Sequence, residues 1–460
     1  MAENSSRKKQ IDMLHGSLAD KLILFALPLA FTGILQQLFN AADIAVVGRF
    51  VGREAMAAVG SDSPIVALIV HLFVGLSLGA NVVIASAVGR GDLKMVRRAV
   101  HTSLLFSVIV GCALSVLCEL YAGTFVRMMD VPAEVYSMAE GYLKIYLTGL
   151  PVIMLYNFEA AVYRSVGNTR TPLAALTVSG VVNVFLNVFF VVVLGMDVDG
   201  VAWATVISNG ISAAMLLFLL VRDNSAVSLN FREVRIDAGA LKRILRIGLP
   251  AGVQGMIFSI SNIIIQTAIN SLGTVVMAAS SAAYNVEVAA YCVINAFAQA
   301  CTTFVGQNFG ARNLPRCRRV LWESLLLDSI FNAAACLLIL CFGHAILACF
   351  NPDEEVIAVG LVRLKYIFLA YIFSVFQEVF SGYMRGYGVS TLPAVLSMAG
   401  ICGTRILWIY TVFRAHSTFQ CIMQVYPVSL IVTASAIALA ALACERRIRK
   451  NAGAPAEGRK

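Results

Sequence analysis

The chain has 460 residues, of which 59% are hydrophobic and only 13% are charged. Soluble domains carry about 25% charged residues, so this composition excludes an ordinary soluble protein and indicates a chain that folds in a lipid bilayer. The net charge of +9 is compatible with a nucleic-acid partner. However, the basic residues lie in short connectors between apolar segments, and this placement predicts a membrane protein with no nucleic-acid partner.

Apolar segments long enough to cross a bilayer, about 20 residues each, follow one another along the whole chain. In order, they cover residues 20–46, 56–86, 98–122, 134–163, 172–195, 199–222, 244–270, 276–305, 317–348, 357–383, 391–413 and 420–443. The sequence therefore predicts an all-α membrane protein with twelve transmembrane helices.

The connectors divide the chain into two helical halves with short ends. The predicted parts are an N-terminal segment at 1–19, helices 1–6 at 20–222, a linker at 223–243, helices 7–12 at 244–443 and a tail at 444–460. Basic residues such as Arg97 and Arg318 gather in every second connector, whereas acids such as Asp353 occur in the others. Basic connectors stay in the cytoplasm. We therefore expect a multi-pass protein of the bacterial inner (plasma) membrane with both termini cytoplasmic.

A shift of 221 residues superposes the first half of the chain on the second. It aligns Gly52, Gly89, Arg97, Arg164 and Pro172 with Gly273, Gly310, Arg318, Arg385 and Pro393. One offset held over several helices indicates an internal duplication. Because each half has an even number of helices, the two lobes are expected to be pseudo-symmetric about an axis along the membrane normal. Such duplication is typical of transporters, although it can also build a scaffold that transports nothing.

Helix 1 carries polar side chains in an apolar segment. Gln36, Asn40 and Asp43 are three or four residues apart, which places them on one face of the helix. Charged groups at membrane depth usually face a cavity or a partner. Asp43 could alternate between an ionised form that binds a cation and a protonated form, which suits coupling to H⁺ or Na⁺. The alternative is an acid at the outer membrane surface that pairs with Arg49 or Arg53.

Helices 5 and 6 supply further oxygen atoms. Asn183 and Asn187 are four residues apart in helix 5, and Thr205 lies in helix 6. Amide and hydroxyl oxygens can complete the shell of a hard cation around one carboxylate, such as that of Asp43. The alternative for the two asparagines is hydrogen bonding that only holds helices together.

Polar side chains in other helices are candidates for a substrate-facing cavity. With Gln36 and Asn40, they are Glu159, Gln254, Asn262, Glu287, Gln377 and Glu378. For the three glutamates, the alternatives are salt bridges or side chains that extend to the membrane surface.

The sequence contains no motif of an enzyme. It lacks a phosphate-binding G-x-x-x-x-G-K-[ST] loop, a Ser/His/Asp set and an H-E-x-x-H motif. The eleven cysteines and five histidines are dispersed, so no metal site is predicted beyond Na⁺ at Asp43, and no cofactor is expected. Uphill transport would then have to use an ion gradient.

Several segments together resemble the multidrug and toxic compound extrusion (MATE) family of bacterial antiporters. They are residues 38–43, 47–52, 164–172, 302–311 and 385–388, which read LFNAAD, VGRFVG, RSVGNTRTP, TTFVGQNFGA and RGYG. The resemblance implies two six-helix lobes that exchange Na⁺ or H⁺ for amphipathic, often cationic, organic compounds. It also implies that Asp43 anchors a cation site in the first lobe, with Asn183, Asn187 and Thr205 beside it.

Two positions depart from the family pattern. Position 187 is often an aspartate in the family and is Asn187 here, which would weaken a Na⁺ site and favour protons. In helix 10, Ser374 stands where some members have an aspartate.

Two other functions remain open from the sequence. One is a flippase for lipid-linked precursors from the same superfamily, and the other is a membrane scaffold without transport activity. The expected partners are small organic substrates and membrane lipids, and the expected state is a monomer.

Overall fold

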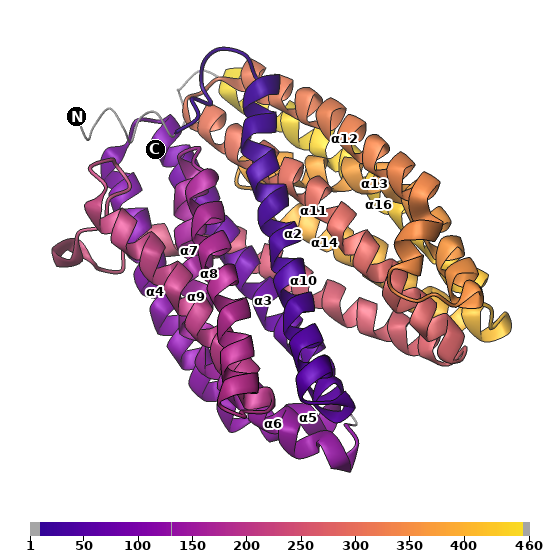
Figure 1. The fold of residues 1–460 in the computed structure, drawn as a ribbon. Coiled ribbons are helices and arrows are strands. Elements are labelled where there is room, and N and C mark those ends of the chain that lie inside the picture. The colour runs from indigo at the N-terminus through magenta and orange to yellow at the C-terminus, as the bar shows by residue number, and fades with distance from the viewer. Residues whose placement is uncertain (1–9, 130, 454–460) are drawn as a thin grey trace. The chain divides into compact units, whose positions relative to one another are not determined.

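The computed structural model describes residues 10–129 and 131–453, and within them it contains helices but no β-strand (Figure 1). Residues 1–9 of the predicted N-terminal segment and residues 454–460 of the predicted tail lie outside the described residues. Among the described residues, eleven helices or continuous helical runs are long and apolar enough to cross a membrane, and a bent pair makes twelve if it counts as one span. The predicted all-α fold with twelve spans is confirmed.

The first half of the chain contains the bent pair. Its helices are α2 (Ala19–Phe50), α3 (Arg53–Gly89), α4 (Leu93–Leu120), α5 (Ala122–Met128), α6 (Ala133–Thr148), α7 (Leu150–Ser165), α8 (Arg170–Val188), the π-helix η1 (Phe189–Val193) and α9 (Val198–Arg222). Helices α6 and α7 meet at an angle of 47°. The break lies at Gly149, and Pro151 two residues later has no N–H to continue the hydrogen bonding of α6.

The second half begins after the 3₁₀ turn η2 (Phe231–Glu233), and there the counterpart of the bent pair is one continuous helix, α13 (Glu354–Gly386). The second half also contains α10 (Ala238–Asn270), α11 (Thr274–Gly310), α12 (Leu314–Ala348), α14 (Thr391–Ser397), α15 (Thr404–Trp408) and α16 (Phe419–Gly453). The π-helices η3 (Met398–Gly403) and η4 (Ile409–Phe413) flank α15, so α14 to η4 form one continuous run.

The described chain divides into two compact units. Unit 1 holds residues 10–12 and Leu27–Ser259, and unit 2 holds Met13–Ala26 and residues 260–453. Helices α2 and α10 therefore each contribute residues to both units. In α2 the boundary between the two units lies between Ala26 and Leu27, next to Pro28 in the interior of the helix.

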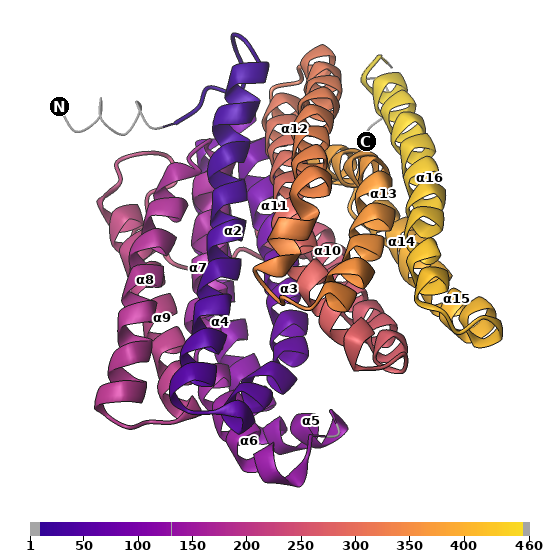
Figure 2. The same ribbon diagram turned by 45° about the vertical axis from the view of Figure 1, so that its right-hand side comes forward.

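Unit 1 is held together by close packing of small residues as well as by its apolar core. Gly75 and Gly79 of α3 face Gly248 and Gly252 of α10 so closely that a Cβ atom at any of these four positions would meet the backbone of the other helix. In membranes, such pairs of small residues let helix backbones approach and pack. Helices α8 and α9 also pack against each other and run side by side in Figures 1 and 2.

Unit 2 contains Met13–Ala26, the end of α10 and the helices from α11 to α16. Phe25 of α2 packs edge to face on Phe304 of α11, with ring centroids 5.6 Å apart. The amide of Asn308 donates to the carbonyl of Met13 at 3.1 Å, and the guanidinium of Arg316 donates to the same carbonyl at 3.1 Å. These contacts fix the N-terminal segment Met13–Ala26 to unit 2.

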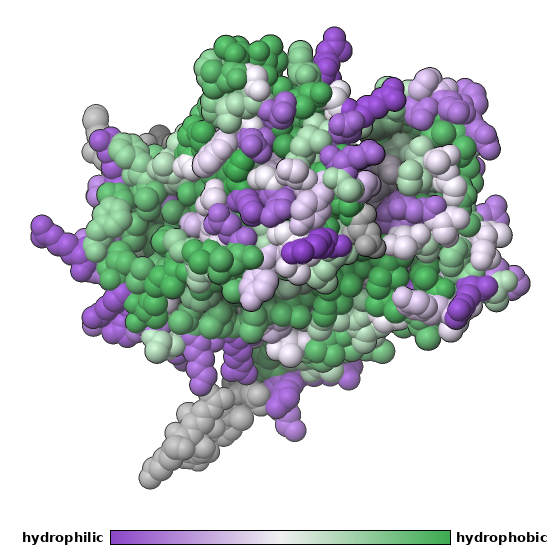
Figure 3. All heavy atoms as spheres, turned by 90° about the horizontal axis from the view of Figure 1, so that it is seen from below, coloured by the Kyte–Doolittle hydropathy of each residue, from purple (hydrophilic) through white to green (hydrophobic). Residues whose placement is uncertain are grey.

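Large apolar side chains stay exposed on both units. Leu120, Phe185, Leu369 and Leu439 are each at least 70% exposed. Apolar residues, in green, cover much of the face shown in Figure 3, between polar groups in purple. An exposed apolar surface of this extent is expected where lipid chains surround a protein.

Candidate functional site

Asp43 lies inside unit 1, where three helices bring polar groups to it. Its side chain, from the C-terminal half of α2, is only 7% exposed. The amide nitrogen of Asn187 in α8 donates to one carboxylate oxygen at 2.5 Å, and the hydroxyl of Thr205 in α9 donates to the other at 3.2 Å. The structure thus brings together residues that are 144 and 162 positions apart in the sequence.

Asn183 completes this group one turn before Asn187. The amide nitrogen of Asn187 also lies 3.3 Å from the amide oxygen of Asn183. Asn187 is fully buried, and its own amide oxygen has no hydrogen-bond partner in the described part of the chain. The π-helix η1 begins two residues after Asn187. Such π segments are rare and are frequent at functional sites, because they change the direction of the side chains around them.

The oxygen atoms at this site have two chemical uses. A carboxylate, amide oxygens and a hydroxyl are ligands that hard cations prefer, and the same carboxylate can bind a proton instead. Among the described residues, no group of three or more His, Cys, Asp or Glu side chains could hold a metal ion. A cation at Asp43 would therefore depend on the oxygens of Asn183, Asn187 and Thr205.

A second carboxylate of unit 1 was missed in the sequence. Asp62 of α3 is fully buried, and neither of its oxygens has a hydrogen-bond partner among the described residues. Tyr142 of α6 interacts electrostatically with both Asp43 and Asp62, so the two acids share one neighbourhood. An acid within the predicted span 56–86 was the available signal, but the flanking Ser61 and Ser63 make that stretch look like the end of a helix.

The other polar residues predicted in α2, α7 and α10 differ in burial. Gln36 and Asn40 of α2 are exposed, although helical spacing puts them on the same side as the buried Asp43. Glu159 of α7 is fully buried, and its carboxylate has no hydrogen-bond partner in the described chain. Gln254 of α10 is buried, whereas Asn262, further along the same helix, is exposed.

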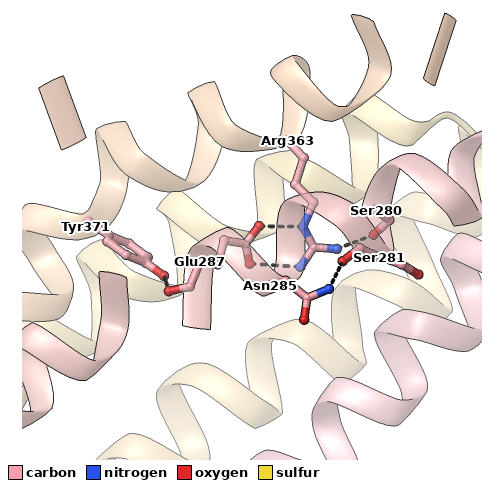
Figure 4. Close-up of polar contacts among 6 residues, drawn as sticks. All are labelled: Ser280, Ser281, Asn285, Glu287, Arg363 and Tyr371. Carbon is pink, nitrogen blue, oxygen red and sulfur yellow. Dashed lines mark hydrogen bonds and ion pairs between the residues drawn. The ribbon is translucent and has the colours of Figure 1, made fainter. Parts of the chain in front are cut away.

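Glu287 of unit 2 forms an ion pair, which is the alternative that the sequence left open. Its carboxylate receives two parallel hydrogen bonds from Arg363 of α13, at 2.5 and 2.9 Å (Figure 4). The third nitrogen of this guanidinium donates to the hydroxyl of Ser280. The hydroxyl of Tyr371 donates to the backbone carbonyl of Glu287 at 3.1 Å. Arg363 lies inside a predicted span, but sequence reasoning did not single it out.

Glu378 of α13 lies in a separate polar group of unit 2. The hydroxyl of Tyr291 donates to its carboxylate at 3.0 Å, and the amide of Gln377 lies 3.3 Å from the same oxygen. Asp328 of α12, which was also missed, is fully buried without a hydrogen-bond partner in the described residues. It interacts electrostatically with Glu378.

Known proteins resemble this chain over most of its length. The MatE family model matches residues 28–189 and again residues 250–411, a displacement of 222 residues that agrees with the internal repeat. The chain is 28% identical to the probable multidrug resistance protein YoeA of Bacillus subtilis, over 83% of this chain and 84% of that protein. It is 26% identical to the probable multidrug resistance protein NorM of Thermotoga maritima, over 84% of each chain.

A solved structure shares the fold. It is described as the outward-facing conformation of a multidrug resistance MATE family transporter. It matches with a TM-score of 0.89 and 22% sequence identity, over 96% of this chain and 99% of that chain.

Proposed function

The chain belongs to the MATE family of membrane transporters, and from this premise we propose that it exports amphipathic, often cationic, organic compounds in exchange for H⁺ or Na⁺. It is a transporter rather than an enzyme. The observation that carries the coupling proposal is the buried carboxylate of Asp43, which receives hydrogen bonds from Asn187 and Thr205.

The hydrogen bonds at Asp43 suggest how ion binding changes the site. An ionised carboxylate only accepts hydrogen bonds, and both of its neighbours donate to it here. A proton on Asp43 adds a donor, and a cation requires oxygens rather than N–H groups around it. With a cation bound, the amide of Asn187 would turn its oxygen towards Asp43, and that oxygen is without a partner among the described residues.

Helix α2 can transmit this change along its length. Pro28 removes one hydrogen bond from the interior of α2 and makes the helix easier to bend there. The bend would fall where α2 passes from unit 2 to unit 1. We propose that loading Asp43 repacks the part of α2 beyond Pro28 and lowers the affinity for the exported compound. We further propose a monomer in the bacterial plasma membrane with cytoplasmic termini, as the basic connectors predict.

A flux assay with the purified full chain in proteoliposomes tests this function. Ethidium is the exported probe, and an inward Na⁺ gradient and an inward H⁺ gradient are applied in separate experiments. We expect one gradient to drive ethidium transport and Asp43→Asn to reduce that transport at least about tenfold, because asparagine can neither gain a proton nor balance a cation. Gradient-driven flux that Asp43→Asn leaves undiminished would exclude this role for Asp43.

The matched control is Asp20→Asn. Asp20 is a carboxylate of the same helix, but it is exposed. Its replacement changes the net charge by the same amount and is expected to leave ethidium flux unchanged. If neither gradient drives ethidium transport by the unmodified protein, the proposed antiport itself is wrong.

A further inference from the structure

The internal repeat identifies a counterpart of the Asp43 site in unit 2. The 221-residue shift aligns Leu143-Lys144 with Leu364-Lys365 and Ser208 with Ser429, which fixes the register of two helix pairs. In that register, Tyr142 corresponds to Arg363, and Thr205 corresponds to Tyr426. Helix α8 likewise corresponds to the run from α14 to η4.

The counterpart carries the opposite charge. Asn183 falls at Thr404 in the same register, directly beside Arg405. In the first helix of each repeat the shift is 222 residues, because Pro28 and Asn40 align with Pro250 and Asn262. The position equivalent to Asp43 is therefore Ile265, and the acid of unit 1 has no equivalent in unit 2. Where unit 1 places two acids near Tyr142, unit 2 places two arginines near Tyr426.

One aromatic ring joins the two arginines. The guanidinium carbon of Arg405 lies 4.4 Å from the ring centre of Tyr426, and that of Arg363 lies 5.9 Å from it. The Nε atom of Arg405 also donates to the hydroxyl of Ser429, at 3.4 Å. These contacts attract a guanidinium and hold it in place, but they do not neutralise its charge.

The positive charge of Arg405 is not balanced. Within the part of the chain that the structure describes, Arg405 forms no ion pair. Glu287 acts on it electrostatically, but Arg363 already occupies both oxygens of Glu287. The group of Glu287, Arg363 and Arg405 therefore keeps one net positive charge. Because Arg405 is half-buried, part of the side chain remains accessible to a solute.

The backbone around Arg405 is also distorted. Helix α15 has only five residues, and π-helices of six and five residues flank it on both sides. In unit 1, the corresponding helix α8 is followed by the π-helix η1, directly after the asparagines beside Asp43. Both repeats thus carry the same rare distortion beside their polar groups, and such segments are frequent at functional sites.

We propose that Arg405 binds the carboxylate or phosphate group of an amphipathic substrate, with Tyr426 against the guanidinium and the Arg363–Glu287 pair beside it. An uncompensated charge at membrane depth is unfavourable unless a partner or ligand is present, and such residues mark substrate pathways. The planar fork of arginine matches the oxygens of carboxylates and phosphates. The proposal deepens the proposed transport function, because it adds anionic and zwitterionic compounds to the substrates.

Binding of carboxyfluorescein to the full chain in detergent tests the site without requiring transport. We expect the unmodified protein to bind the free acid at least about tenfold more tightly than its dimethyl ester, in which both carboxylates are esterified. Arg405→Gln should lose at least about tenfold in affinity for the acid and none for the ester. Arg405→Lys should lose less, because it keeps the charge without the fork.

The matched control is Arg414→Gln, since Arg414 is an exposed arginine just beyond η4. It should bind carboxyfluorescein like the unmodified protein. Loss of binding of both the acid and the ester by Arg405→Gln would indicate a structural role and overturn the proposal.

Two further results would overturn the proposal. One is equal binding of the free acid and the ester by the unmodified protein, a comparison that needs no variant to fold. The other is that Arg405→Gln lowers the retention of phosphatidylglycerol while dye binding is unchanged, because the site would then hold a lipid headgroup. Dye binding that depends on Arg405 in a protein without gradient-driven ethidium flux would keep this site and reject the proposed antiport.

Discussion

Replacing Glu287 by glutamine should strongly destabilise unit 2, because it leaves the guanidinium of Arg363 buried without a counter-ion. The side chains of Arg363 and Glu287 are only 3% and 7% exposed, so water cannot replace the lost carboxylate. Removing one partner of a buried ion pair costs about 3–5 kcal/mol. Glutamine still offers one oxygen to the guanidinium, so we expect a loss of about 3 kcal/mol in the free energy of unfolding.

Unfolding by SDS titration in mixed micelles measures this loss. Glu354→Gln is the matched control, because Glu354 of the same helix α13 forms an ion pair with His344 whose side chains are 79% and 59% exposed. Exposed pairs contribute little to stability, so the control should unfold like the unmodified protein.

A double variant separates the ion pair from simple loss of packing. Glu287→Leu with Arg363→Met removes both charges and keeps apolar volume, and buried pairs can often be replaced in this way without loss of stability. We expect this variant to be more stable than Glu287→Gln. The reasoning is wrong if Glu287→Gln unfolds within about 1 kcal/mol of the unmodified protein, or if the double variant is no more stable than the single one.

Three further predictions use the same preparations. Asp62→Leu should raise the free energy of unfolding by about 1–3 kcal/mol, since it replaces a buried polar group that has no hydrogen-bond partner in the described chain with an apolar side chain of similar size. A decrease on SDS titration would contradict this. Gly75→Val should lower the free energy of unfolding by about 1–3 kcal/mol, because its side chain would clash with the backbone of α10. Gly60→Ala is the control, since the space around a Cβ at Gly60 is open, and it should leave the free energy of unfolding unchanged. Equal free energies of unfolding for the two variants would refute the packing argument. Asn187→Asp should lower the Na⁺ concentration that gives half-maximal ethidium flux, because a second carboxylate beside Asp43 strengthens Na⁺ binding. An unchanged Na⁺ dependence would argue against Na⁺ binding at this site.

Local chemistry explains why much of the fold could be predicted. A chain in lipid must satisfy its backbone hydrogen bonds within each segment, so long apolar runs are read as helices. The one predicted span that the structure breaks, residues 134–163, contains Gly149 and Pro151, which are the residues that interrupt a helix. The repeat was visible because the residues that shape helix ends, such as Gly52 and Gly273, recur at one spacing.

The grouping of polar side chains could be predicted only in part. The spacing of Asn183 and Asn187 indicated a shared face, and the structure directs that face to Asp43. The same argument placed Gln36 and Asn40 with Asp43, but they are exposed. Helical periodicity gives the angle between side chains on one helix, whereas burial also depends on which neighbouring helices cover each turn.

The sequence by itself determined that this protein folds in a lipid bilayer, where its helical spans lie, that it is duplicated and which acid is a candidate for ion coupling. Each of these follows from composition or from the spacing of residues along the chain. Only the tertiary structure decided which charges have partners. It paired Glu287 with Arg363, left Asp62 and Asp328 without hydrogen bonds among the described residues, and placed Arg405 on Tyr426. Partners on different helices are set by packing between segments, and no pattern within one segment contains that information.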